Sequence, residues 1–260
     1  MAREKEEMMR LAVMNALEKK ERLGIEESME LLHVSESTVR RLFSKMETTQ
    51  DVIRVHGGIR RNPAQGSYQY FSSLGTNQEA KHMIGIKAAD LVENDDFIFI
   101  DCGTTTVHMA QHLVERLKEG NLHGVTVVTN SLANLEILAP NYNVMLIGGN
   151  YYTERRSFAG YFSEKFIDRF HFNKSFVGVD GFTFEEGFAT SDPDFARLSA
   201  AAMKISEHSY VLMDSSKIGK RAFMVYDKYE RVHRIITDNR VSADALDHFR
   251  DNDIEVLIAE

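Results

Sequence analysis

Apolar side chains recur at helical spacing near the start of the chain. Met9, Ala12, Val13, Ala16 and Leu17 lie at i, i+3, i+4, i+7 and i+8, which predicts an amphipathic helix ending near residues 23–24. A second short helix is predicted across residues 26–32, and a third begins at residue 35 or 36 after a turn at 33–34. Three short helices with a tight turn between the last two have the spacing of a helix-turn-helix motif.

The third predicted helix has an apolar face and a polar face. Val39, Leu42, Phe43 and Met46 form the apolar stripe, so hydroxyl and basic side chains point away from the core, as on a helix that enters the major groove. Residues 52–61 then form two β-prone runs around Gly57-Gly58, which predicts a hairpin wing with basic tips lying along phosphates. The residues predicted to contact DNA are Ser35, Ser37, Thr38, Arg40, Arg41, Lys45, Arg54, His56, Arg60 and Arg61.

A small helical bundle with a solvated charged face would show the same pattern as a DNA-binding module. The distribution of charge along the chain helps to distinguish the two. Residues 1–61 carry 12 Lys/Arg and 11 Asp/Glu, and residues 62–260 carry 19 and 28. Six of the basic residues and only two of the acidic ones lie within residues 40–61. The net charge of −8 therefore comes from the larger part, and a basic stripe closes the N-terminal part. This asymmetry indicates a nucleic-acid-binding module ahead of an acidic domain with another task.

Residues 62–76 show no helical or strand period and predict a partly docked linker, because Pro63, Gly66 and Gly75 surround three aromatic residues. From residue 77 onward, helical and strand patterns alternate. This order predicts an α/β domain with a mostly parallel, Rossmann-like sheet covered on both faces. Strands are expected at 97–100, 125–128, 144–147, 175–179, 210–213, 234–237 and 254–258, and helices at 79–92, 107–117, 132–138, 164–169, 194–206 and 243–250. We therefore divide the chain into 1–61, the linker 62–76 and the domain 77–260.

Candidate chemistry lies at the carboxyl ends of these strands, where such sheets bind ligands. Asp101-Cys-Gly-Thr-Thr-Thr106 follows the first strand and opens a helix, so its amides and hydroxyls form a candidate phosphate site. Capping and turn formation would also account for these residues. The complete set of candidate effector-binding residues is Asp101, Gly103, Thr104, Thr105, Thr106, Asn130, Gly148, Gly149, Asp180, Gly181, Asp214 and Lys217.

Composition narrows the class of protein. The 260 residues are 43% apolar and 27% charged, which excludes a disordered or collagen-like chain, and the single cysteine, Cys102, excludes internal disulfides. Without an apolar leader, the chain is expected in the cytoplasm, and its apolar runs of about five residues are too short to span a membrane. We expect no metal, cofactor or catalytic residue.

The N-terminal motifs resemble the winged helix-turn-helix of the DeoR-type bacterial repressors. The resemblance rests on Val34-Ser-x-Ser-Thr-Val-Arg-Arg41, Met46-Glu47 and Arg54-Val-His-Gly-Gly58. Leu42 stands where that family typically has Asp, which puts a copied operator preference in doubt. His33 stands where the turn often has Gly, and His tolerates a left-handed backbone better than most residues.

The strand-end motifs, in their order, are similar to the sugar-phosphate sensor domain of the same family. They are Asp101-x-Gly-Thr-Thr-Thr106, Val128-Thr-Asn130, Ile147-Gly-Gly149, Gly160, Phe176-x-Gly178-x-Asp180-Gly181, Gly187-x-x-Thr190, Asp214-Ser-Ser-Lys217 and Ile236-Thr-Asp238. The resemblance implies a fold like that of ribose-5-phosphate isomerase, a phosphorylated sugar effector, double-stranded operator DNA as partner and a homodimer or homotetramer.

Two other functions compete with the regulator. A sugar-phosphate isomerase would need a general base, for which Glu185 or Glu186 could be proposed, but both flank Gly187 in a polar turn. A redox switch at Cys102 would need a lowered thiol pKa and a resolving cysteine, which the chain lacks.

Overall fold

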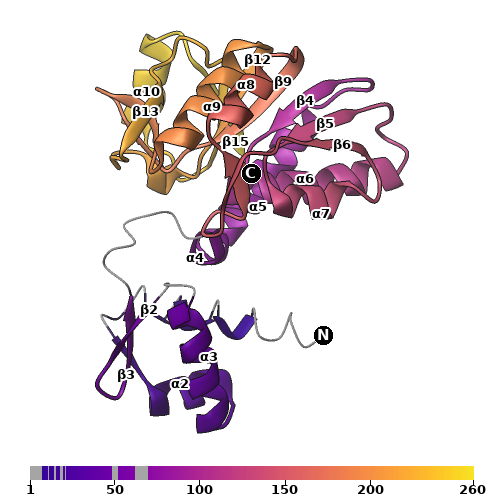
Figure 1. Ribbon diagram of the computed structural model, residues 1–260. Coiled ribbons are helices and arrows are strands. Elements are labelled where there is room, and N and C mark those ends of the chain that lie inside the picture. The colour runs from indigo at the N-terminus through magenta and orange to yellow at the C-terminus, as the bar shows by residue number, and fades with distance from the viewer. Residues whose placement is uncertain are drawn as a thin grey trace. The chain divides into compact units, whose positions relative to one another are not determined.

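The computed structural model describes residues 8–10, 12–14, 16–17, 20, 22–48, 52–61 and 70–260, without the side chains of Arg61 and Phe71. The chain divides into two compact units, Met1–Thr76 and Asn77–Glu260 (Figure 1). We call them the N-terminal unit and the sensor unit.

The N-terminal unit combines helices with a small antiparallel sheet. Described residues between 8 and 17 are helical, and β1 (Arg22–Gly24), α2 (Ile25–Leu32), α3 (Glu36–Thr48), β2 (Val52–Val55), β3 (Gly58–Arg61) and α4 (Tyr70–Gly75) follow. The apolar stripe predicted for α3 is buried with Val13, Leu23 and Ile59 in one core. The residue after α2, His33, has φ 52° and closes the helix in the left-handed conformation, which confirms that the turn survives without glycine.

Three expectations for this unit were wrong in detail. The first helix does not run to residues 23–24, because Arg22–Gly24 form β1 and pair with β3, Leu23 opposite Ile59. The wing turns at His56-Gly57, where Gly57 has φ 79°, and Gly58 already belongs to β3. Part of the predicted linker is helical as α4, and its residues 62–69 lie outside the described residues.

A seven-stranded, fully parallel sheet forms the centre of the sensor unit. Its strand order is β15-β14-β12-β9-β4-β5-β6. The strands are β4 (Phe97–Ile100), β5 (Thr126–Thr129), β6 (Asn143–Leu146), β9 (Phe172–Gly178), β12 (Ser206–Leu212), β14 (Arg234–Asp238) and β15 (Glu255–Ala259). Each predicted strand matches one of these to within a few residues.

Helices cover both faces of this sheet, as Figure 1 shows. One core lies beneath α5 (Gln78–Asp90), α6 (Thr104–Lys118) and α7 (Leu132–Leu138). The other lies beneath α8 (Tyr161–Ile167), α9 (Pro193–Lys204) and α10 (Ala243–Asp251). The predicted α/β class with a covered parallel sheet is therefore confirmed.

Antiparallel strands that the sequence did not predict connect the parallel ones. They are the pair β7 (Asn150–Tyr152) and β8 (Ser157–Ala159), and the sheet of β10 (Gly181–Thr183), β11 (Gly187–Thr190) and β13 (Met224–Asp227). A 3-10 turn, η1 (Ser215–Lys217), follows β12. The β7–β8 hairpin and the β10–β11 hairpin both follow carboxyl ends of parallel strands, so they lie at the edge where ligands are expected.

Candidate functional site

Helix α3 carries half of the predicted DNA-contacting side chains, and most of these are exposed. The Oγ of Ser35 lies 3.0 Å from both Ser37 Oγ and Thr38 Oγ1, so these hydroxyls form one cluster where α3 begins. Arg41 and Lys45 are exposed farther along the helix, and Arg40 donates from Nε to Glu36 Oε1 at 2.7 Å. This exposed, partly basic face can reach bases and phosphates.

Arg54 is oriented differently from the other predicted contacts. Its guanidinium donates to the backbone oxygen of Arg40 at 3.1 Å and to Ser44 Oγ at 2.8 Å, and it lies 3.5 Å from Glu47. Arg54 therefore fastens the wing to α3. His56 and Arg60 are exposed on the wing, while Arg61 has a described backbone only.

The sensor sheet reverses its strand order between β4 and β9. From β4 the chain continues outward to β5 and β6, whereas β9, β12, β14 and β15 build the opposite side. In doubly wound sheets this switch point opens a crevice outside the carboxyl ends of the strands. Asp101 directly follows β4, and Gly178 ends β9.

Asp101 closes the switch point with its carboxylate. Its Oδ1 accepts from the amide of Gly103 at 2.8 Å, and its Oδ2 accepts from the amide of Gly178 at 2.6 Å. Burial raises the pKa of Asp101 to about 6, although these two amides favour the charged form. Both oxygens have partners within the protein, so Asp101 joins β4 to β9. The sequence had suggested instead that this carboxylate is open to a ligand.

The predicted phosphate loop leads into α6. Its N-cap residue, Gly103, has no side chain that could cap the helix. The first amides of a helix have no carbonyl partner within it, so they remain available to an anion. The hydroxyl of Thr106 donates to the backbone oxygens of Asp101 and Gly103 at 2.8 and 2.6 Å. Thr106 therefore braces the loop, and Thr104 and Thr105 lie buried beside it.

Asn130 supplies an unsatisfied acceptor next to this loop. Ile100 and Thr129 pair in register, so Asn130 and Asp101 emerge from neighbouring strands. The Nδ2 of Asn130 donates to the backbone oxygen of Phe158 at 2.9 Å, but its buried Oδ1 has no partner among the described residues. An unpaired buried polar atom costs free energy, which a bound hydroxyl would recover.

Sequence reasoning missed the most strongly bonded charge of the site, Arg155. Arg155 lies in the turn between β7 and β8. Its guanidinium donates to Asp180 Oδ2 at 2.8 Å, to Ser191 Oγ at 2.8 Å and to Thr190 Oγ1 at 3.2 Å. It also lies 4.6 Å from the centre of the Phe195 ring. Nothing in the local sequence separates buried Arg155 from its neighbour Arg156. Only the fold of the hairpin turns it inward.

The environment of Asp180 keeps it ionised. Burial by itself would raise the pKa, but the charge of Arg155 and the hydroxyl and amide of Ser191 outweigh it and hold the pKa of Asp180 at about 2. The side chain of Arg155 is 6% exposed and that of Asp180 16%. This ion pair anchors the β7–β8 hairpin above the strand ends.

The remaining predicted effector residues are distributed along the same edge. Asp214 Oδ1 accepts from Asn77 Nδ2 at 2.8 Å and from the Ser216 amide at 3.2 Å, so it organises η1. Lys217 is half-buried, and its ammonium forms no ion pair with any residue that the structure describes. Gly148 and Gly149 lie exposed after β6, whereas a Cβ on Gly181 would lie 2.4 Å from the backbone oxygen of Lys220. Gly181 is thus required by packing.

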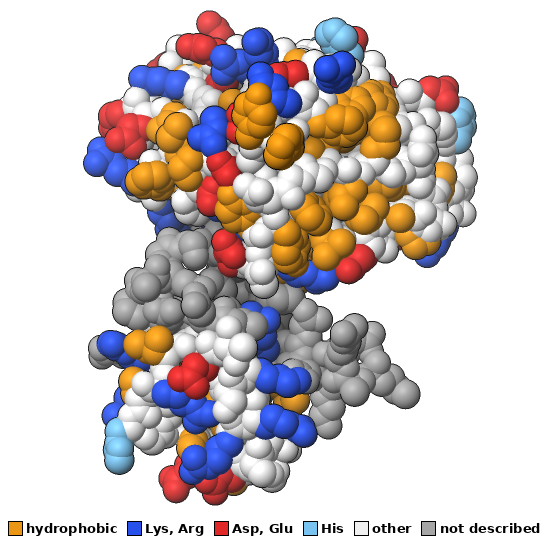
Figure 2. All heavy atoms as spheres, viewed as in Figure 1, with side chains coloured by type: hydrophobic (Ala, Val, Ile, Leu, Met, Phe, Trp, Pro, Cys, Tyr) orange, Lys and Arg blue, Asp and Glu red, His pale blue; other side chains and the backbone are white. Residues whose placement is uncertain are grey.

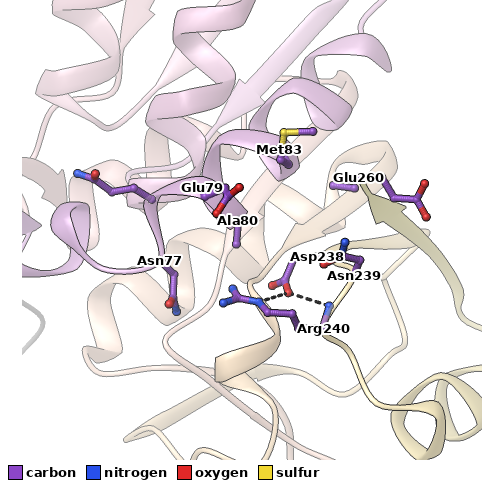
Figure 3. Close-up of a pocket in the computed structure, with 10 residues that line it drawn as sticks. Asn77, Glu79, Ala80, Met83, Asp238, Asn239, Arg240 and Glu260 are labelled. Carbon is purple, nitrogen blue, oxygen red and sulfur yellow. Dashed lines mark hydrogen bonds and ion pairs between the residues drawn. The ribbon is translucent and has the colours of Figure 1, made fainter.

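A pocket of about 490 Å³ opens at the outer end of this edge, away from the α6 loop (Figure 3). It lies between the first turn of α5, with Asn77 and Glu79, and the ends of β14 and β15. Arg240 Nε donates to Asp238 Oδ1 at 2.9 Å on its lower side in Figure 3. None of the predicted effector residues lines it.

The competing chemistries find little support in the geometry. Glu185 is exposed in the turn between β10 and β11, and the amide of Glu186 donates to Thr183 Oγ1 at 3.2 Å. Cys102 is buried, and burial together with the charge of Asp101 raises the pKa of its thiol to about 12. Within the described residues, no group of three or more His, Cys, Asp or Glu could hold a metal ion, and no helix is long and apolar enough to cross a membrane.

Two family models match the chain on either side of the boundary between the units. Residues 11–65 match the DeoR-like helix-turn-helix domain, and residues 76–239 match the DeoR C terminal sensor domain. The chain belongs to the DeoR family. It is a DNA-binding transcriptional regulator of that family and not an isomerase.

Relatives along most of the chain agree with this membership. The chain is 35% identical over 223 residues to an uncharacterized HTH-type transcriptional regulator, FruR, of Bacillus subtilis, covering 82% of this chain and 84% of the relative. It is 31% identical over 223 residues to the lactose phosphotransferase system repressor of Staphylococcus epidermidis, again covering 82% of this chain and 84% of the relative.

The comparison with solved structures gives weaker matches. A ribose 5-phosphate isomerase from Methanocaldococcus jannaschii matches 56% of each chain with 16% identity and a TM-score of 0.43.

Proposed function

We propose that this DeoR-family protein represses genes of carbohydrate metabolism and binds a phosphorylated sugar or sugar derivative beyond the carboxyl end of β4. The observation that carries the proposal is the unpartnered, buried Oδ1 of Asn130 beside the uncapped start of α6. A phosphate accepts from the amides of Thr104 and Thr105, which have no carbonyl partner within the helix, and a sugar hydroxyl donates to Asn130 Oδ1. A ligand that carries both groups matches this pair of sites.

Two further observations support a phosphorylated effector. Lys217 brings a cation to the strand-end edge and forms no ion pair in the part of the chain that the structure describes. One relative is named a lactose phosphotransferase system repressor, which fits a sugar-derived signal for this chain too. Release of DNA on binding would need about 10⁴-fold preference of the effector for one state, which several charge-assisted hydrogen bonds can supply.

The N-terminal unit would read an operator through α3 and contact phosphates through the wing. One α3 per chain reads one half-site, so two copies would contact half-sites on the order of 34 Å apart. Leu42 is buried in the core of the unit and offers no carboxylate to a neighbouring arginine. We therefore expect an operator that differs from those of relatives with Asp at this position.

A thermal-shift screen of phosphorylated sugars against the whole chain tests the effector. A ligand that binds only the folded state raises the melting temperature. For the active sugar phosphate, Thr105→Ala and Lys217→Ala should each weaken binding about tenfold, because each removes one polar contact. Arg240→Ala, in the pocket of Figure 3, serves as the matched control. Loss of binding in the control with retention in Thr105→Ala would move the effector to that pocket and refute the proposed site.

Operator binding is tested separately by fluorescence anisotropy on selected DNA. Replacing Arg40 and Arg41 with Ala should weaken specific binding by at least about a hundredfold, because a base contact by Arg contributes about 1–3 kcal/mol. Arg22→Ala removes an exposed cation from β1 and is the matched control. Unchanged operator affinity in the double variant would contradict the assignment of α3 as the recognition helix.

A further inference from the structure

Aromatic side chains that ordinarily lie inside a protein are exposed on one side of the sensor unit. Tyr151 is 47% exposed, Tyr161 66%, Phe162 74% and Phe166 49%. Together with the half-buried Phe158 and Phe170 they form what we call the aromatic face. Figure 2 shows hydrophobic side chains gathered on this unit where Figure 1 draws α8 and the strands β4, β5 and β6. Contiguous apolar patches of this kind mark interaction surfaces.

The rings of the aromatic face contact one another in pairs and come from two adjoining segments. Tyr151 and Phe158 face each other across the β7–β8 hairpin with tilted rings whose centres lie 5.2 Å apart, and Phe166 meets Phe170 edge to face at 5.2 Å. The hairpin leads directly into α8, whose residues Phe162 and Phe166 stand one turn apart on the outer side. The neighbouring positions Ser163 and Ile167 are buried, so α8 packs on the sensor unit through a different side from the one that carries these exposed rings.

We propose that the aromatic face binds the same face of a second copy of this chain. The four most exposed aromatic side chains offer about 500 Å² per copy, if each has about 200 Å² to bury. A stable interface needs about 800 Å² per partner, and Phe158, Phe170 and the surrounding rim can supply the remainder. Tyr, Phe and Met are also the residues enriched at the centres of such interfaces.

The charges around the aromatic face fit a symmetric partner. Lys165, Asp168 and Arg169 are exposed along and just after α8, so the rim carries both signs. A two-fold axis places the same helix opposite itself in reverse, which brings Lys165 of one copy toward Asp168 of the other. A strongly acidic or basic partner would instead meet like charge at one of these positions.

A second copy of the chain as the partner of the aromatic face also follows from the proposed function, on which this step rests. Each chain carries a single recognition helix, and residues 40–61 hold six basic side chains, so one copy neutralises few phosphates. Two copies joined through their sensor units double both the base contacts and the phosphate contacts. Association can be measured without DNA or effector, so its failure is distinguishable from failure of the proposed function.

Sedimentation equilibrium of the full chain tests the aromatic face. The wild type should be dimeric or a multiple of dimers, and Phe162→Asp combined with Phe166→Asp should raise the Kd of association at least about a hundredfold, as for central aromatic anchors. Phe223→Asp is the matched control, because Phe223 is 77% exposed on another segment, just before β13. A monomeric wild type, an unchanged double variant, or dissociation caused by Phe223→Asp instead would each overturn the proposal.

Crosslinking keeps the proposal falsifiable if the double variant fails to fold. Cys102, the one cysteine of the sequence, is 4% exposed, so we expect it not to react with a maleimide in the folded protein. Lys165→Cys leaves the aromatic rings in place and adds one accessible thiol on α8. A short bismaleimide should join two Lys165→Cys chains and not two Arg221→Cys chains, which carry the thiol near Phe223. The reverse pattern, or crosslinking of neither variant, would refute it.

Discussion

The two units place their arginines in opposite environments. Arg41 and Arg60 lie exposed on the N-terminal unit, where water screens their charge. Arg155 lies buried in the sensor unit, bonded to Asp180, Thr190 and Ser191. An exposed arginine contributes almost nothing to folding and much to binding, whereas a buried one mainly maintains the structure around it. The same residue type therefore predicts different experimental outcomes in the two units.

The largest expected effect is loss of the buried ion pair. Arg155→Ala should lower the free energy of unfolding of the sensor unit by about 3–5 kcal/mol, because it leaves the Asp180 carboxylate buried without its cation. Urea denaturation followed by far-UV circular dichroism measures this change. Arg41→Ala, the exposed counterpart, should change stability by no more than about 0.5 kcal/mol. Equal effects of the two substitutions would erase the contrast between the units.

A smaller effect concerns pH and again separates the units. Burial, with the charges of His82 and Lys81, lowers the pKa of His108 to about 4, so the folded sensor unit keeps this imidazole neutral. The unfolded chain takes up the proton near pH 6.5, so stability is greatest above that pH and falls toward pH 4. Asp101, whose pKa is raised to about 6, titrates in the same range with the opposite sign.

The contribution of His108 can be isolated with His108→Gln. From pH 7 to pH 5 the wild type should lose about 1–2 kcal/mol more stability than this variant, as measured by urea denaturation at each pH. His56 is exposed and belongs to the N-terminal unit, so His56→Gln is the matched control. Identical pH profiles for wild type and His108→Gln would show that this imidazole is accessible to protons.

The smallest effect is expected at the turn of the helix-turn-helix. His33 has a left-handed backbone, with φ 52°, which costs a non-glycine residue about 1 kcal/mol. His33→Gly should therefore stabilise the N-terminal unit by about 0.5 kcal/mol after the added flexibility of the unfolded chain is counted. Thermal unfolding measures it, with His56→Gly as control. A destabilised His33→Gly would mean that the imidazole makes a favourable contact.

Regular elements of both units could be predicted because their hydrophobic patterns are strong. The strand 97–100 and the helix 132–138 have the predicted bounds, since each buries a continuous apolar run or stripe. The strands β10, β11 and β13 have three or four residues each, which is too short to show a strand period. In addition, β13 pairs with β11, which lies far from it in the chain, so only tertiary contact specifies β13.

The candidate site likewise has features that the local sequence predicts and features that depend on distant contacts. The switch-point loop could be located because glycine and threonines directly follow a buried strand and open a helix. The internal bonding of Asp101 and Asp214 and the inward turn of Arg155 could not, because they depend on contacts 77, 137 and 25 residues away in the chain. Polar residues at strand ends thus reveal where a site lies before they reveal which of them remain open to a ligand.

The self-contained core of the N-terminal unit has an evolutionary consequence. Among the described residues, the main core cluster of this unit runs from Val13 to Ile59 and includes no residue of the sensor unit. A recombination event near residues 76–77 would therefore exchange the operator-reading part between family members without creating a cavity in either parent's core. Regulation of a new set of genes by an existing sensor would then require changes only at the exposed surface of α3 and the wing.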